Sequence, residues 1–238
     1  MDYACGSCIV RSLDCIILAF SIYLKWNEQT ITDFSDENIN SLYDQGFLFG
    51  RNGKGAIYQT RSLRIDLSKF ELSSENKRIL KKTEDIGHRT YDLPYAKYNW
   101  EIGKMGKDFY TEKFGDGTFS ANKIKELLTT EYNFNKLFVY KNEKETIGYS
   151  ICFENEEILH YSYPFYILSP KSYVFNPNTG MSMMIQAINY AKENNKKFIY
   201  LGSAKDEKAK YKLQFKGLEW FDGEKWSEDL EELKSILK

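Results

Sequence analysis

The spacing of hydrophobic and polar positions predicts an alternation of helices and strands in the first third of the chain. Residues 30–45 repeat apolar side chains at helical spacing after an acidic first turn, and Gly46 ends the pattern. Residues 62–72 alternate apolar and polar positions, which is typical of a half-buried strand. A capped helix that carries several basic side chains is expected over residues 74–82.

The middle of the chain gives a weaker pattern and then a clear one. Residues 86–118 are rich in tyrosine and glycine, and we assign them no regular element. A helix is expected over residues 120–131. Residues 136–168 contain three apolar runs separated by turns, which predicts an antiparallel meander of strands.

The last third begins with a turn at residues 176–182 that opens onto an amphipathic helix. A short buried strand at 198–202 follows, and two further helices are expected at 206–215 and 227–238. This order of elements resembles the core of the GNAT acyltransferases. It implies an α+β or α/β fold with a mixed, mostly antiparallel sheet and helices on both faces. We expect this domain over residues 86–238, and a smaller N-terminal region over residues 1–85.

The charge balance argues against a general nucleic-acid binder. The 238 residues carry a formal net charge of −1, so no overall cationic field attracts DNA or RNA. Locally, residues 61–89 hold eight Lys and Arg against five acids, a net of +3, and residues 222–238 hold six acids against three lysines, a net of −3. A basic patch of this kind favours one anionic partner, although a solvated helix face is the more common explanation of any single charged run.

Two N-terminal features bear on compartment and cofactors. The apolar run at residues 15–24 is about half as long as a bilayer span and lacks a basic segment before it, so we expect a cytoplasmic protein without a membrane partner. Cys5 and Cys8 have the spacing of half a zinc or iron–sulfur site, with Cys15 as a third candidate ligand. The alternative is a pair of small buried thiols.

The turn before the amphipathic helix is a candidate anion cradle. Gly180 and Ser182 lie where a GNAT protein binds the diphosphate of acyl-CoA through backbone amides. Pro177 stands where a basic or glutamine residue would favour that ligand, so a plain strand-to-helix turn is the alternative. His160 lies in an aromatic strand, where packing or hydrogen bonding is expected rather than catalysis.

Several segments in order resemble the aminoacyl-tRNA–protein transferases, the arginyl- and leucyltransferases that mark protein N-termini. They are GFLFGRNGKGAIY, SLRIDLSKFELSSENKRILKK, SYVFNPNTGMSMMIQAINYAKENNKKFIYLG and KYKLQFKGLEWFDGEKW. The resemblance implies an enzyme that moves arginine or leucine from charged tRNA to the α-amine of a protein, usually one that starts with Asp or Glu, as in the N-degron pathway. Its implied partners are charged tRNA and an N-terminal peptide, with neither membrane nor DNA, and no cofactor is required.

The resemblance also suggests roles for individual residues. Four basic residues would contact tRNA phosphates or the acidic N-terminus: Arg64, Arg78, Lys81 and Lys82. Tyr200 or Tyr211 would orient the amine or the ester carbonyl, and Lys212 would contact the tRNA acceptor end. Gly180, Ser182 and Gly202 lie in the segments that would bind substrate. The chain departs from the family in having no cysteine before the strand that carries Arg64.

Two other functions fit the same pattern. One is an acyl-CoA-dependent N-acetyltransferase of the GNAT type, which the turn at Gly180 favours. The other is a non-catalytic module that binds tRNA or protein N-termini. The transferase hypothesis predicts transfer from charged tRNA, whereas the other two predict acetyl-CoA dependence or binding alone.

Overall fold

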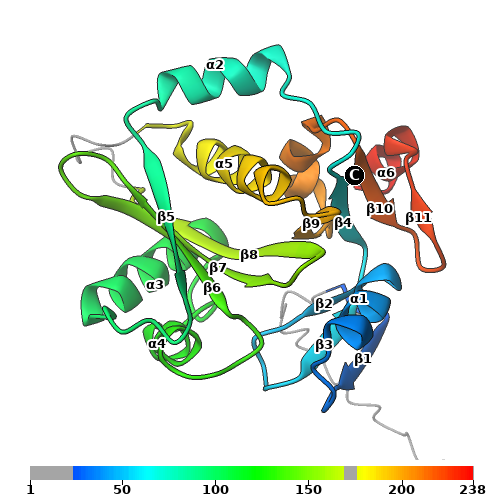
Figure 1. Cartoon of the computed structure of the whole chain (residues 1–238), viewed down its shortest axis with the longest axis horizontal. Helices are drawn as coiled ribbons and strands as arrows, with labels where there is room; N and C mark the ends of the chain where they lie inside the picture. The colour runs from blue at the N-terminus through cyan, green and yellow to red at the C-terminus, as the bar shows by residue number, and fades with distance from the viewer. Residues whose placement is uncertain (1–23, 169–175, 238) are drawn as a thin grey trace, which may run out of the picture.

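The computed structural model describes residues 24–168 and 176–237, and an eight-stranded sheet forms their centre (Figure 1). The strand order is β11-β10-β4-β9-β8-β7-β6-β5, and every neighbouring pair is antiparallel except β8 and β9. The strands are β4 (Ser62–Asp66), β5 (Gly87–Asp92), β6 (Lys136–Lys141), β7 (Thr146–Glu154), β8 (Ile158–Tyr166), β9 (Phe198–Ser203), β10 (Leu218–Phe221) and β11 (Trp226–Ser227). The candidate metal ligands Cys5, Cys8 and Cys15 lie outside the described residues.

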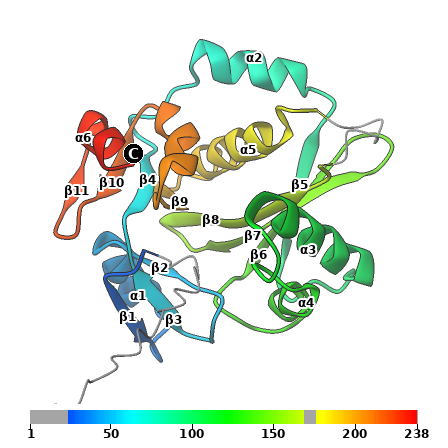
Figure 2. The ribbon, with the colours of Figure 1, turned by 180° about the vertical axis from the view of Figure 1, so that it is seen from behind.

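Helices cover both faces of this sheet, as Figures 1 and 2 show from opposite sides. On one face α5 (Thr179–Glu193) packs against β8 and β9, and α2 (Ser74–Lys82) packs on α5. On the other face lie α3 (Trp100–Phe114) and α4 (Ala121–Thr129). The 3-10 helix η1 (Glu207–Gln214) and α6 (Leu230–Ile236) pack together near the C-terminus. The expected mixed, mostly antiparallel sheet with helices on both faces is therefore confirmed.

A smaller lobe precedes the large sheet. It contains the three-stranded sheet β1-β3-β2, made of β1 (Asn27–Thr30), β2 (Phe47–Phe49) and β3 (Ala56–Gln59), and the helix α1 (Asp36–Asp44). The chain then enters the large sheet at β4, which lies between β10 and β9. The expected boundary at residue 85 thus leaves β4, an interior strand of the large sheet, in the N-terminal region. The small lobe itself ends before Ser62.

The segment 86–118, to which the sequence assigned no element, forms β5 and α3. Glycines at 103 and 106 hide the helical pattern of α3, and both are buried. A Cβ at Gly103 would lie 3.2 Å from the Ala121 carbonyl oxygen, and one at Gly106 would lie 2.4 Å from Ile124 Cδ1. These glycines therefore allow α3 to approach α4 closely, a tertiary reason that local propensity does not express.

Strands β8 and β9 part after three paired residues. The parallel register runs from Ile158 opposite Phe198 to His160 opposite Tyr200, although both strands continue beyond it. A bulge in the β7–β8 register lies beside this point, between Ile151 and Cys152. Bulges of this kind redirect side chains near functional sites. None of the described helices is both long and apolar enough to cross a bilayer.

The junction between the lobe and the large sheet generates a stability prediction. Gly46 has φ +79°, and a Cβ there would lie 2.2 Å from the ring of Phe221. Gly46→Ala should therefore destabilise the protein by about 2–4 kcal/mol, through backbone strain and overpacking. Gly87→Ala is the matched control, because nothing lies within 4 Å of a Cβ at that position. Thermal melts should show a shift only for Gly46→Ala, and equal melting temperatures would contradict the packing described.

Candidate functional site

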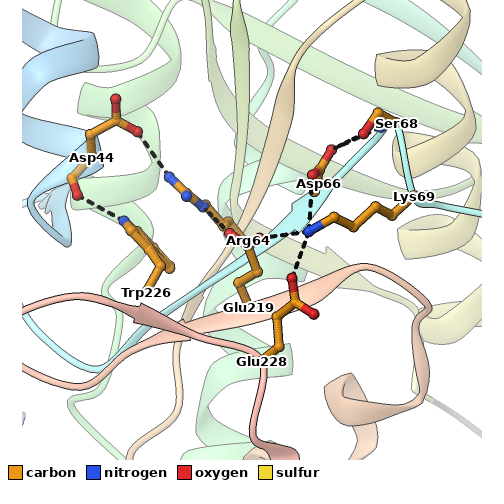
Figure 3. Close-up of polar contacts among 8 residues, drawn as sticks. All are labelled: Asp44, Arg64, Asp66, Ser68, Lys69, Glu219, Trp226 and Glu228. Atoms are coloured by element: carbon orange, nitrogen blue, oxygen red, sulfur yellow. Dashed lines mark hydrogen bonds and ion pairs between the residues drawn. The ribbon is translucent and has the colours of Figure 1, made fainter.

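Arg64 lies at the centre of a charged network between the large sheet and the small lobe (Figure 3). Its Nε donates to Glu219 Oε2 at 2.7 Å, and its Nη1 donates to Asp44 Oδ1 at 2.8 Å. Glu219 is the cross-strand neighbour of Arg64 on β10, and Asp44 is the last residue of α1. Lys69 extends the network through ion pairs with Asp66, Glu219 and Glu228.

Two aromatic rings lie over the guanidinium of Arg64. Its central carbon is 3.9 Å from the ring centroid of Phe198 and 4.0 Å from that of Trp226. The Trp226 indole also donates to the main-chain oxygen of Asp44 at 2.7 Å, at the C-terminal end of α1. The Arg64 side chain is only 10% exposed. Arg64 is thus bound by its own chain and joins the lobe to the sheet.

The other predicted phosphate contacts lie elsewhere. Arg78 is ion-paired with Glu75 on the outer face of α2, where Lys81 and Lys82 are exposed. The structure therefore does not bring the four basic residues together: Arg64 lies within the large sheet, while the other three form a basic face on α2. A tRNA contact through that face stays a prediction.

Of the predicted residues of the acyl-transfer half, Lys212, Gly202 and Tyr211 come together at the end of β9, whereas Tyr200 lies beside Arg64. Lys212 Nζ donates to the main-chain oxygens of Leu201 at 2.7 Å and Ser203 at 3.4 Å. Gly202, between them, has φ +79°, and a Cβ there would lie 3.7 Å from Lys212 Nζ. Burial of the ammonium lowers the pKa of Lys212 to about 8, because the charged form loses its hydration.

The same region contains the buried dyad of Tyr43 and His160. The Tyr43 hydroxyl and His160 Nδ1 lie 2.9 Å apart, and the Tyr43 oxygen accepts from the main-chain N–H of Phe49. The hydrogen-bonding role expected for His160 is confirmed. Burial lowers the pKa of His160 to about 3, and the nearby Lys212 cation acts in the same direction. His160 Nε2 is buried and has no hydrogen-bond partner among the described atoms.

The two predicted tyrosines, Tyr200 and Tyr211, differ in their exposure to solvent. Tyr200 is fully buried, with its ring 4.9 Å from that of Tyr43, and burial raises the pKa of its phenol. Tyr211 is 49% exposed and precedes Lys212 on η1. Burial of its hydroxyl end raises the pKa of Tyr211 to about 12, and the Tyr166 phenol adds to the rise. Of the two, Tyr211 is placed to meet a substrate, because Tyr200 is closed off from solvent.

The turn at Gly180 is closely packed. A Cβ at Gly180 would lie 2.5 Å from the Tyr166 hydroxyl. The Ser182 hydroxyl is buried and lies 2.7 Å from that of Thr83, which joins α5 to α2. The N–H groups of Asn178 and Thr179 are both bonded to Asn176. These two N–H groups are therefore already used, and Pro177 has none to offer an anion.

No group of three or more His, Cys, Asp and Glu side chains in the described ranges is arranged to hold a metal ion. Cys152, the free cysteine in these ranges, is buried, and burial raises the pKa of its thiol to about 12. A thiol with so high a pKa is a poor nucleophile and metal ligand near neutral pH. A zinc or iron–sulfur site at Cys5 and Cys8 stays a prediction.

The network around Arg64 predicts a large difference between two arginines. Arg64→Ala leaves the Glu219 carboxylate, 11% exposed, without its main partner, and should cost about 3–5 kcal/mol. Arg78→Ala removes an exposed ion pair within one helix turn and should cost under about 0.5 kcal/mol. Urea unfolding of both variants measures the difference, and equal losses would show that Arg64 does not join the lobe to the sheet.

The buried imidazole predicts a loss of stability in acid. The folded protein keeps His160 neutral down to a pKa of about 3, whereas the unfolded chain binds a proton below about pH 6.5. The contribution of His160 is therefore complete above about pH 6.5 and declines as the pH falls. Between about pH 7.5 and 5 the wild type should lose about 2 kcal/mol more than His160→Gln. Parallel losses in the two proteins would place the acid sensitivity elsewhere.

Comparison with known proteins gives one match of nearly full length. The chain is 23% identical over 219 residues to an aspartate/glutamate leucyltransferase of Pseudoalteromonas atlantica, covering 86% of this chain and 91% of the relative. No family model matches the chain.

Similar solved structures overlap with the chain in part. L-PGS from Bacillus licheniformis is 15% identical, with TM-score 0.43 and coverage of 71% of this chain and 52% of that one. FemX is 11% identical, with TM-score 0.41 and coverage of 71% and 60%. The chain thus spans about half the length of the L-PGS structure. The nearly full-length match to the leucyltransferase supports the resemblance to the aminoacyl-tRNA–protein transferases that was inferred from the sequence.

Proposed function

We propose that this protein is an aminoacyltransferase that moves an amino acid from charged tRNA to the N-terminal α-amine of a protein. The observation that carries the proposal is the buried ammonium of Lys212, held by two carbonyl oxygens where β8 and β9 part. Lys212 forms no ion pair with a carboxylate of the described residues. Its charge is therefore not neutralised by a neighbouring acid in this part of the chain.

An ammonium in this setting suits the aminolysis of an ester. The amine attacks the ester carbonyl, a C–N bond forms, and negative charge develops on the carbonyl oxygen before the bond to the ribose oxygen breaks. Lys212 keeps one N–H free of its two carbonyl contacts, and this N–H would stabilise the developing charge. With its pKa near 8, Lys212 is mostly protonated at neutral pH and would also supply a proton to the departing ribose oxygen. The proton that the attacking nitrogen loses as the amide forms would then return to Lys212.

The charges near the site favour leucine over arginine as the transferred residue. Lys212 is a cation whose Nζ lies 5.8 Å from the ring centroid of Tyr211, and the Tyr166 phenol lies close enough to Tyr211 to raise its pKa. A guanidinium would need a carboxylate partner, which these residues do not supply, whereas an apolar side chain packs well against aromatic rings. The relative from Pseudoalteromonas atlantica is named a leucyltransferase, which agrees with leucine as the residue to test first.

The packing of the turn at Gly180 argues against the acyl-CoA alternative. A diphosphate needs several free main-chain N–H groups at a helix N-terminus. Pro177 has no N–H, and those of Asn178 and Thr179 are already bonded to Asn176. We therefore take charged tRNA, a cytoplasmic reactant, as the acyl donor, and protein N-termini of the N-degron pathway as the acceptors.

The test is transfer of labelled amino acid from a panel of charged tRNAs to peptides with defined first residues. The wild type should transfer leucine to peptides that begin with Asp or Glu. Lys212→Met should lower the turnover number by about 100-fold or more, because it removes the charge and keeps much of the volume. Lys210→Met, at an exposed lysine of the same 3-10 helix, should stay within about 3-fold of the wild type.

The outcomes separate the hypotheses. If no charged tRNA gives a product with the wild type, the proposed function is wrong. Binding of tRNA or peptide without transfer would favour the non-catalytic module. Thermal stabilisation by acetyl-CoA would favour the N-acetyltransferase, because a ligand that binds the folded state raises the melting temperature. An active Lys212→Met variant would show that the ammonium has no part in the chemistry.

A further inference from the structure

A second cation lies at the end of β9 beside Lys212. Arg61 directly precedes Ser62, whose register partner on β9 is Ser203. Its Nη1 donates to the main-chain oxygen of Ala204 at 3.2 Å, and the N–H of Ala204 donates to the main-chain oxygen of Arg61 at 2.8 Å. Arg61 and Lys212 thus hold three carbonyl oxygens of the four-residue stretch 201–204.

The guanidinium of Arg61 has few hydrogen-bond partners and no ion-pair partner in the described chain. Its Nε is buried without a hydrogen-bond partner in residues 24–168 and 176–237. No carboxylate in these ranges lies within ion-pair distance of it. Burial lowers the pKa of Arg61, which indicates desolvation without a compensating anion.

Three other arginines of the described ranges have better-paired guanidinium groups than Arg61. Arg64 is bonded to Glu219 and Asp44 and lies between two aromatic rings. Arg78 is paired with Glu75. Arg51 donates to the Thr118 carbonyl and lies 4.2 Å from the ring centroid of Phe119. Arg61 alone among these four has a buried guanidinium nitrogen without a partner in the described chain, at the point where Lys212 is also held.

We propose that Arg61 binds the side-chain carboxylate of the acceptor's first residue and so selects acidic N-termini. This inference rests on the proposed function. The carboxylate of Asp or Glu is joined to the same residue as the attacking α-amine, so the group that recognises it must lie next to the group that assists the reaction. Arg61 meets this condition because it is bound to Ala204, one residue after the Ser203 carbonyl that Lys212 holds.

A carboxylate fits this position better than an RNA phosphate does. The guanidinium is half-buried, and its planar fork of N–H groups matches the two oxygens of a carboxylate. A phosphodiester between two nucleosides would have to be buried with them. Basic side chains that follow an RNA backbone are instead found on open surfaces, such as the outer face of α2.

The first arm of the test is transfer kinetics with paired peptides that differ only in Asp or Asn as the first residue. The wild type should prefer Asp by about 10-fold or more in kcat/KM, a typical effect of one charge-assisted pair. Arg61→Gln should reduce this preference to under about 3-fold, mainly by raising KM for the Asp peptide. Arg61→Lys keeps the charge without the planar fork and should give an intermediate preference.

The second arm is direct binding of the same peptides without tRNA, measured by titration calorimetry. Tighter binding of the Asp peptide should depend on Arg61 and persist in Arg89→Gln, at an exposed arginine on β5, four strands away from β9. If the wild type binds the Asp peptide through Arg61 but transfers nothing, the proposed function fails and the carboxylate site stands. If the wild type transfers amino acid and Arg61→Gln keeps the preference for Asp, the carboxylate site is wrong. If the wild type shows no preference between the Asp and Asn peptides in either arm, the carboxylate site is wrong, whatever the variants do.

Discussion

The candidate site depends on the parting of β8 and β9. A strand that leaves its partner inside a protein exposes main-chain carbonyl groups that need donors, and an unmet buried acceptor costs about 1–3 kcal/mol. At the end of β9 Lys212 donates to the oxygens of Leu201 and Ser203, and on the β4 side Arg61 donates to that of Ala204. On the β8 side, the Tyr110 hydroxyl donates to the Pro164 oxygen at 3.1 Å. The same main-chain requirement that stabilises the fold thus places two cations where an anionic substrate group would bind.

The position of the small lobe is the second condition for the site. Tyr43, which bonds to His160, belongs to α1, so its hydroxyl reaches β8 only if α1 is held against the large sheet. Arg64 and Trp226 hold it, because both bond to Asp44 at the end of α1. Arg64 therefore influences the region around Lys212 through packing, without contacting it. This role explains a buried arginine in the first strand of the large sheet better than a contact with solvent-exposed phosphates does.

The sequence predicted elements whose pattern is local and failed where tertiary contacts override the pattern. The helices α2, α4 and α5 and the meander of β6, β7 and β8 follow apolar periodicity, and each was expected within a few residues of its bounds. Helix α3 was missed because Gly103 and Gly106 serve its packing on α4. Lys212 was singled out through the family resemblance, but its carbonyl contacts depend on where β8 and β9 part. Arg61 and Arg64 are three residues apart in the sequence, one just before β4 and one inside it, and only cross-strand partners and burial distinguish their roles.

The way Lys212 is held bears on its chemistry. An ammonium paired with a carboxylate forms a neutral unit, and an approaching anion then meets little net charge. Carbonyl oxygens orient the ammonium through their dipoles and leave its full positive charge in place. That arrangement is costly in the resting protein, as the lowered pKa of Lys212 shows, and the cost falls when negative charge develops nearby. An uncompensated cation is unfavourable before the reaction and is stabilised when negative charge develops during it. Such a site therefore binds the transition state more strongly than the ground state.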